Sequence, residues 1–537
     1  MGLKRDQWCH DLGRWTKLLG RPASQSMPRR RMDERQDCWI TFRMGKLLNP
    51  NSDITEHTQS TCVYSRQQDL GDTMPDETHP TTPQAPPPDR LQRMANIIGA
   101  LIPDAMTMAI LLMVLLGIGA FLNGDPLLKV MDAYYLGLWM LLPFTMQMTL
   151  ILVLGSALAS TRFFRRMILT LSKLPGSEGQ TIALSMITTC CLAYCFWGLS
   201  LALAPLVAVS YARQSERKGH PVDFPFLLSC NAAAGAIWQF GLSASAPLLM
   251  NTPGHFLEDE TGLMPLSTTI WAPATLIYLA IYLSCVFVLA RLLMPKKARP
   301  ISLFPESAKL GDLTLDAAAK PVEKEPRSDR FAERLEASRW PCSILTATLF
   351  GWLLYHVFVK DGGLQLNSLI TALLALGLLL HGTVLSFARS LPRAVSTAWP
   401  VIVLYHLYAG VAGLLENTSI GTDFANYLAS VSNEYTFPLL TLVSAAVVSV
   451  FVPSSGGQWV IQGFITTKAS VAVGVTAQRG LLALSVGDHV GNLVSPFWAV
   501  IAAGIARMDF RTYIGYNYVW VVLWVGFGAL CFTFLPA

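Results

Sequence analysis

The sequence predicts an all-α polytopic membrane protein with two inverted repeats, each containing a re-entrant hairpin and a broken transmembrane helix. Apolar residues make up 52% of the 537-residue chain and charged residues 14%. Two long stretches without any charge do not fit single upright spans, and Lys and Arg gather in alternate loops. The net charge of +5 therefore reflects membrane orientation. We expect membrane lipid around the protein and no nucleic-acid partner.

Residues 1–94 differ from the rest of the chain. They are rich in Arg, Asp, Gln, Pro and Ser, include "TTPQAPPPDR" and have no periodic apolar face, so we expect disorder. They contain no apolar core of a signal peptide. Two alternatives stay open: a cytoplasmic tail, or a true start at an internal methionine such as Met74 or Met94.

The apolar segments then divide the chain into regions. We expect a first membrane repeat at 95–294, a cytoplasmic loop at 295–341, a connecting transmembrane helix at 342–359 and a second, inverted repeat at 360–537. Ordinary spans are expected at 99–122, 135–158, 268–294, 342–359, 366–385, 397–416 and 514–534.

Thr181–Ser210 and Pro438–Thr467 are the two stretches that do not fit. Each has 30 residues without a charge, which would make a straight helix about 45 Å long. Basic residues flank the first stretch on both sides, so both of its ends should face the cytoplasm. A re-entrant hairpin with its tip near "FWGLS", Phe196–Ser200, meets that requirement, and "PSSGGQ", Pro453–Gln458, marks the second tip. A single long tilted helix is the alternative for each stretch.

An apolar segment interrupted by small residues follows each hairpin, at 238–254 and at 486–500. Breaks at these positions free backbone groups that hydrocarbon cannot satisfy, so they must line a protein or water cavity. Offsets of 257 and 250 residues superpose the elements of the two halves in the same order. With the amino end inside, the inner segments from residue 90 onward hold 24 Lys and Arg and the outer ones four, which favours an inverted arrangement.

Inverted repeats with broken helices are the architecture of secondary transporters, and the amino ends of half-helices suit a carboxylate. We expect no catalytic residue, because neither H-E-x-x-H nor G-x-S-x-G occurs, and no metal or other cofactor. Asp488 and His489 are candidates for ion coupling, with Na⁺ and H⁺ both open. The small and polar residues at the breaks are the candidates for substrate binding: Gly198, Ser200, Gly241, Ser243, Ser245, Ser454, Ser455, Gly456, Gly457, Gln458, Asn492 and Ser495.

Several of these stretches resemble the short-chain fatty acid transporter family of bacterial inner-membrane proteins. The resemblance covers about residues 95–537 and rests on "VPSSGGQWVIQG", "GLSASAPLL", "TPG", "PFWA", "IPDAM" and "ERLEASR". It implies a carrier of the wider ion-transporter superfamily that takes up small monocarboxylates such as butyrate or acetoacetate. The chain departs from the family pattern at Ser455, where a glycine is usual, at Gln458, where a histidine is often found, and at Phe196, where an asparagine is often found.

The function expected from these features is secondary active import of short-chain fatty acids across the bacterial inner membrane, by cation symport and with the amino end in the cytoplasm. The alternative is a carrier of the same fold for another small anion, such as a dicarboxylate or an amino acid, or an ion antiporter. Analogy with related hairpin carriers suggests a homodimer.

Overall fold

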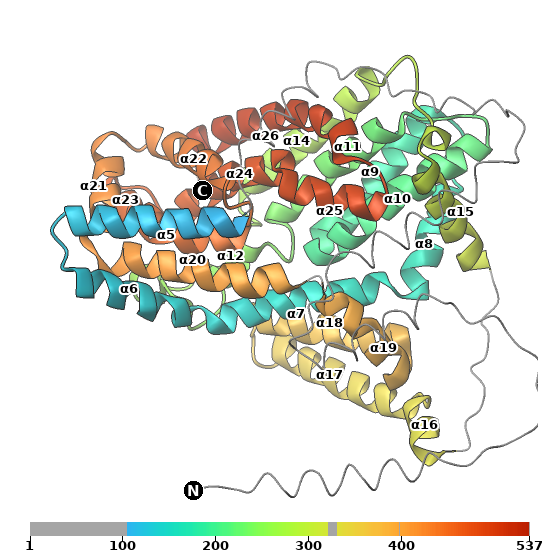
Figure 1. Ribbon diagram of the computed structural model, residues 1–537, viewed down its shortest axis with the longest axis horizontal. Coiled ribbons are helices and arrows are strands. Elements are labelled where there is room, and N and C mark those ends of the chain that lie inside the picture. The colour runs from blue at the N-terminus through green and yellow to red at the C-terminus, as the bar shows by residue number, and fades with distance from the viewer. Residues whose placement is uncertain (1–104, 320–329, 397, 536–537) are drawn as a thin grey trace, which may run out of the picture. The chain divides into compact units, whose positions relative to one another are not determined.

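The computed structural model describes residues 105–319, 330–396 and 398–535 (Figure 1). The expectations for residues 1–94, for the start of the first span and for part of the cytoplasmic loop fall outside these residues. Every regular element in the described part of the chain is a helix, which confirms the all-α fold. Among the described residues, five helices are long and apolar enough to cross a membrane, or up to six if a bent pair counts as one span.

The first half contains the hairpin and the broken helix in the expected order. Its helices are α5 Ala105–Leu122, α6 Leu127–Met140, α7 Leu142–Ala159, α8 Arg162–Ser172, α9 Glu178–Cys195, α10 Trp197–Arg217, α11 Phe224–Gly235, η1 Ala236–Phe240, α12 Ser245–Met250, α13 Glu258–Thr261, η2 Leu266–Thr268 and α14 Pro273–Leu292. The connecting segment contains η3 Ile301–Leu303, α15 Pro305–Ala319, α16 Phe331–Glu336 and α17 Trp340–Phe358.

The second half repeats this order. Its helices are α18 Leu366–His381, α19 Val384–Val395, α20 Trp399–Asn417, α21 Ser419–Ser430, α22 Thr436–Ser449, α23 Ser455–Ala472, α24 Ala477–Val494, α25 Pro496–Ala506, η4 Phe510–Thr512 and α26 Ile514–Phe534.

The stretch from Thr181 to Ser210 is a hairpin. Helices α9 and α10 are separated only by Phe196, whose backbone is extended. The Thr181 hydroxyl, at the start of α9, lies 2.9 Å from that of Ser215, near the end of α10. The two helices therefore run back along each other, which confirms the hairpin and shows that the alternative of one tilted helix is wrong.

The second uncharged stretch also folds back on itself. Helices α22 and α23 are separated by residues 450–454. Near this turn, Gln458 Nε2 donates to the carbonyl oxygen of Ala445 at 2.8 Å. At the other end, Phe437 of α22 packs with Ala469 of α23 in one buried cluster. The stretch is therefore the second hairpin that the sequence predicts.

Both predicted helix breaks are present. In the first half, α11 and η1 end before Gly241, and α12 starts only at Ser245. A Cβ on Gly241 would lie 2.5 Å from the carbonyl oxygen of Tyr194, so this close approach of two segments of the backbone requires glycine. In the second half, the path bends by 50° between α24 and α25, at Ser495. Ser495 precedes Pro496, and a proline disfavours helical backbone angles at the residue before it.

The repeat predicted from the sequence offset is visible in the helix boundaries. Helices α19, α20 and α21 each begin 257 residues after α6, α7 and α8 (384 − 127, 399 − 142 and 419 − 162). Contacts between the halves occur in matched pairs: α20 packs on α5 and α6, and α7 packs on α18 and α19 (Figure 1). The inversion of the second repeat relative to the membrane stays a prediction.

Two predicted spans have the wrong bounds. The span expected at 135–158 is two helices, α6 and α7, interrupted at Leu141, because Pro143 in the first turn of α7 has no N–H to continue the hydrogen-bond ladder. The span expected at 366–385 ends at His381, because Gly382 adopts a left-handed conformation with φ 74° and terminates α18.

Helix α15 in the segment after α14 packs on α8 and α10. The Arg213 guanidinium of α10 donates two hydrogen bonds of 2.9 Å to the Asp312 carboxylate of α15. The pKa of Asp312 lies below its usual range, first because of these bonds and also because Arg217 donates to it. The segment expected as a cytoplasmic loop thus contains a helix anchored to the first hairpin.

Candidate functional site

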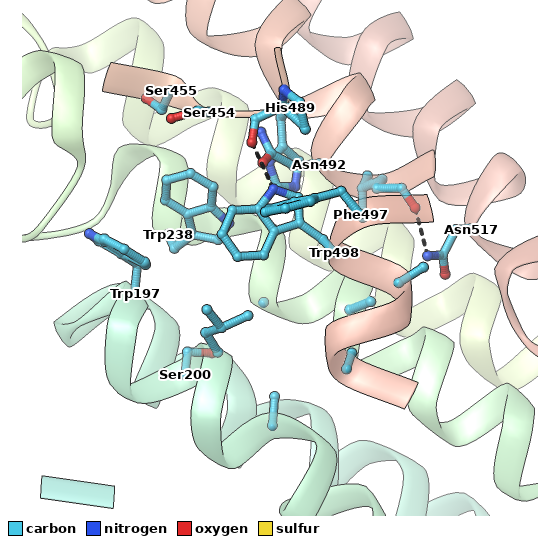
Figure 2. A pocket seen from close by; sticks show the side chains of 18 of the residues that line it. Trp197, Ser200, Trp238, Ser454, Ser455, His489, Asn492, Phe497, Trp498 and Asn517 are labelled. Atoms are coloured by element: carbon cyan, nitrogen blue, oxygen red, sulfur yellow. Dashed lines mark hydrogen bonds between the residues drawn. The ribbon is translucent and has the colours of Figure 1, made fainter. Parts of the chain in front are cut away.

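A cavity of about 190 Å³ lies where the two hairpins and the two broken helices meet (Figure 2). We call it the hairpin cavity. Its lining comes from α9, α10, α11, η1, α12, α20, α24, α25 and α26, and from the turn before α23 together with the first residue of α23. Among the described residues that line it there is no Lys or Arg. Its side chains with hydroxyl, amide or imidazole groups are Thr189, Ser200, Asn231, Ser245, Tyr405, Tyr408, Ser454, Ser455, His489, Asn492, Tyr513 and Asn517.

The amino ends of helices α10, α23 and α25 lie at the hairpin cavity. Helix α10 starts at Trp197, α23 at Ser455 and α25 at Pro496, and Trp197, Ser455 and Phe497 line the cavity. The first turn of a helix has backbone N–H groups without a partner inside the helix and carries the positive end of the helix dipole. Three such ends at one cavity favour an anion there without a cationic side chain.

Hydroxyl groups are concentrated at the second hairpin tip. The Tyr405 hydroxyl of α20 lies 2.7 Å from the Ser454 hydroxyl. The Ser455 hydroxyl is buried and has no hydrogen-bond partner in the described part of the chain. A buried hydroxyl without a partner is costly. Ser455 therefore offers a free donor to a ligand in the cavity.

Asn492 connects the hairpin cavity to a buried carboxyl group. Its Nδ2 donates to Asp488 Oδ2 at 3.0 Å, and Gln239 Nε2 of η1 donates to the same oxygen at 2.8 Å. Asn492 lines the cavity, whereas Asp488 lies behind it and is 0% exposed. The Asn492 side chain therefore connects the Asp488 carboxyl group to the cavity.

Aromatic rings form one wall of the cavity. The rings of Trp197 and Trp238 lie 6.2 Å apart, and Trp238 lies 5.6 Å from the His489 ring (Figure 2). On the other side, Trp498 Nε1 donates to the carbonyl oxygen of Pro453 at 2.7 Å, which fixes α25 to the second hairpin tip. These contacts join elements of both halves around the cavity.

The structure brings together part of the set of residues that the sequence singles out. Six of these residues line the hairpin cavity: Ser200, Ser245, Ser454, Ser455, His489 and Asn492. Their role in substrate binding or coupling stays a prediction.

The other candidates from the first half lie behind the cavity wall. Gly198 packs against the Phe196 ring, and Gly241 allows the close approach of Tyr194. The Ser243 hydroxyl accepts a hydrogen bond of 2.9 Å from the backbone N–H of Trp197. Ser243 therefore caps the start of α10.

The remaining candidates from the second half also have structural contacts. Gly456 packs on Phe144 and Gly457 on Tyr408, both inside α23 rather than in a turn. Gln458 is buried and bonds within the second hairpin. Ser495 accepts from the N–H of Phe497 and caps α25.

Sequence reasoning missed several residues of the lining. Trp238 and Trp498 lie at the ends of the interrupted segments and could have been found from that position. Tyr405 and Asn517 lie in uninterrupted apolar helices, α20 and α26, where only the rotation of the helix decides what faces the cavity.

Comparison with known proteins identifies the family of this chain. Residues 89–535 match the family described as Short chain fatty acid transporter. The chain belongs to this family. Proteins of Escherichia coli (strain K12) and Haemophilus influenzae (strain ATCC 51907 / DSM 11121 / KW20 / Rd), both provisionally named short-chain fatty acid transporters, are each 28% identical to it, over 79% of this chain and 94% of their own. The Alcanivorax borkumensis YdaH transporter crystal structure is similar with a TM-score of 0.48 and 13% identity, covering 82% of this chain and 95% of its own.

Proposed function

We propose that this family member is a secondary transporter, and not an enzyme, that imports short-chain fatty acids such as butyrate or acetoacetate across the bacterial inner membrane by cation symport. The substrate carboxylate binds in the hairpin cavity. The observation that carries the proposal is the convergence of three helix amino ends and the Ser455 hydroxyl on this cavity.

The dimensions and lining of the cavity support a small ligand with one charged end. About 190 Å³ is below the range of roughly 300–1,000 Å³ that is typical of pockets for drug-sized molecules. Leu201, Leu228, Leu404 and Leu493 add apolar surface to the lining, which suits a short alkyl chain.

A dicarboxylate or an amino acid would bring a second charged group into the cavity. A second carboxylate would need another set of donors, and the described lining offers no Lys or Arg for it. An α-ammonium group would need a carboxylate, and Asp488 does not line the cavity. The lining therefore favours monocarboxylates over both alternatives.

The test is uptake of labelled butyrate by proteoliposomes containing the purified full chain, corrected with protein-free vesicles. We expect saturable uptake that unlabelled butyrate and acetoacetate inhibit and that succinate and glutamate do not. Ser454→Leu fills the cavity and should abolish uptake, whereas the matched change Ser430→Leu, on the exposed end of α21, should not. Strong inhibition by succinate or glutamate, or normal uptake by the Ser454 variant, contradicts the proposal.

A further inference from the structure

Asp488 of α24 occupies an unusual environment for an acidic residue. It is 0% exposed, and its Oδ2 accepts hydrogen bonds from the amides of Gln239 and Asn492. Its Oδ1 has no hydrogen-bond partner of normal geometry in the described part of the chain, although the backbone N–H of Ser454 lies near the carboxyl group, and Oε1 of Gln239 is buried without a partner there. The cluster therefore has two acceptor atoms in need of a donor.

The described elements that pack around α24 supply no positive charge to Asp488. Helices α22, α12 and α25 and the 3-10 helix η1 contain no ionisable residue. The Lys468 ammonium of α23 bonds to the Thr422 hydroxyl and lies over the Phe464 ring, and Arg479 at the start of α24 bonds to the carbonyl oxygens of Phe532 and Thr533.

The Tyr405 phenol of α20 faces Asp488, and His489 is its neighbour along α24. The ionisable residues of α26, which packs on α24, are Tyr516, Tyr518 and Cys531. Neither a neutral phenol nor a neutral imidazole balances a carboxylate. An unpaired carboxylate at this depth is strongly disfavoured, whereas the neutral acid carries the O–H donor that the cluster lacks.

We propose that Asp488 carries the proton that this protein co-transports with its monocarboxylate substrate. This inference rests on the proposed function and identifies the coupling cation as H⁺. One proton binds to the Asp488 carboxylate from the outer solution and is released from it to the cytoplasm. One proton moves with one carboxylate anion, so the cycle transfers no net charge.

Asn492 provides the link between proton and substrate. When Asp488 is ionised, its Oδ2 accepts one hydrogen bond from Asn492 Nδ2, which also donates to the Asp488 backbone carbonyl oxygen at 3.2 Å, and the negative charge behind the cavity wall repels a second anion. When Asp488 is protonated, that hydrogen bond weakens, and the Asn492 amide becomes available to the substrate carboxylate. Substrate therefore binds tightly only to the protonated protein.

The surroundings favour Asp488 over the other candidates for coupling. Both ring nitrogens of His489 are buried without a partner in the described residues, and its ring packs on Trp238 and Trp524, so a second N–H would remain unpaired. A sodium ion requires oxygen ligands. The amide groups nearest the Asp488 carboxyl instead direct N–H hydrogens at it.

The experiment compares wild type, Asp488→Asn and, as a matched control, Asp132→Asn on the exposed surface of α6. Purified full-length protein in proteoliposomes is assayed for initial butyrate uptake driven by an acid-outside pH gradient, for uptake driven by a Na⁺ gradient, and for exchange of labelled against unlabelled butyrate at equal pH. Protein-free vesicles correct for passive entry of butyric acid. Infrared difference spectra between acid and alkaline pH, which need no substrate, monitor the carboxylic acid C=O band.

For wild type and Asp132→Asn we expect an acid-outside gradient to accelerate the initial, protein-dependent uptake of butyrate, because the outer solution then supplies the proton that each substrate requires. Asp488→Asn should lose this acceleration, retain exchange that no longer varies with pH, and lack one carboxylic acid band that wild type shows at neutral pH. Coupling through Asp488 is overturned if the gradient still accelerates protein-dependent uptake by the variant, or if a Na⁺ gradient drives wild type. If wild type neither takes up nor exchanges butyrate, the proposed substrate is wrong, and absence of the infrared band would overturn protonation of Asp488 separately.

Discussion

Replacement of Gly491 by Ala tests the packing that holds Asp488 and Asn492 in place. Gly491 lies between these two residues on α24 and faces α22, where its N–H donates to the Ser449 hydroxyl at 2.9 Å. A Cβ on Gly491 would lie 1.9 Å from the Ser449 carbonyl oxygen. An ordinary contact begins at 3.4 Å, so the two helices would have to separate by 1.5 Å (3.4 − 1.9).

This separation is large for a packed interface. It would lengthen the Gly491–Ser449 hydrogen bond beyond bonding distance. Overpacking costs about 1–3 kcal/mol, more than the gain of about 1 kcal/mol from the better helix propensity of Ala. A displacement of about 1 Å near a site is also enough to reduce turnover by an order of magnitude or more. We therefore expect Gly491→Ala to lower the thermal unfolding midpoint and to reduce butyrate uptake at least about tenfold.

The control is Gly526→Ala in α26, where a Cβ would meet no atom within 4 Å. This change should leave uptake and the unfolding midpoint unchanged or slightly raise the latter, because only the propensity gain applies. Both variants are compared by thermal unfolding of the detergent-solubilised protein and by uptake in proteoliposomes. A Gly491→Ala protein with wild-type stability and uptake would refute the close approach of α22 and α24.

Three further predictions concern other contacts. The pKa of Asp125 is held at about 2 by a hydrogen bond from Lys129 and by the N–H and hydroxyl of Ser419. Because this pKa is lowered, the stabilisation from Asp125 is present above about pH 4 and is lost as the pH falls toward 2. In unfolding measurements, Asp125→Asn should therefore lower the free energy of unfolding by about 1 kcal/mol at pH 7 and by much less near pH 2. Arg213→Gln should release α15 and make residues 305–319 sensitive to limited proteolysis. The control Lys309→Gln, on the exposed face of the same helix, should not. Equal resistance of the two variants to proteolysis would argue against the contact between Arg213 and Asp312. Ser243→Ala should raise the apparent KM for butyrate, because α10 loses its cap, and Ser243→Thr should restore the wild-type KM. An unchanged KM in the Ala variant would show that Ser243 does not position α10.

The sequence by itself determined the class of the protein and the order of its elements. Long uncharged stretches require either a fold-back or an overlong helix, and for the first stretch the basic residues at both ends favour the fold-back. Thr181 beside Ser215 shows that this reasoning was sound. The offset of 257 residues between halves also appears in the helix starts, because similar patterns of apolar and breaking residues produce similar segment lengths.

Glycine was the least reliable signal for the position of a turn. In "PSSGG", Gly456 and Gly457 were expected at a hairpin tip, yet the turn lies before them and both lie inside α23. They permit close contact with Phe144 and Tyr408 rather than a bend. A glycine that allows a turn and one that allows close packing look the same in a sequence, because the missing side chain serves both.

Only the tertiary structure decided which residues face the hairpin cavity. Gln239 and Asp488 are 249 positions apart in the chain and meet through a hydrogen bond of 2.8 Å. Tyr405 reaches Ser454 from an uninterrupted helix. Such meetings depend on how each helix is rotated and how the two halves pack together. Hydropathy and charge fix the segments of a membrane protein, whereas contacts between distant segments fix its binding site.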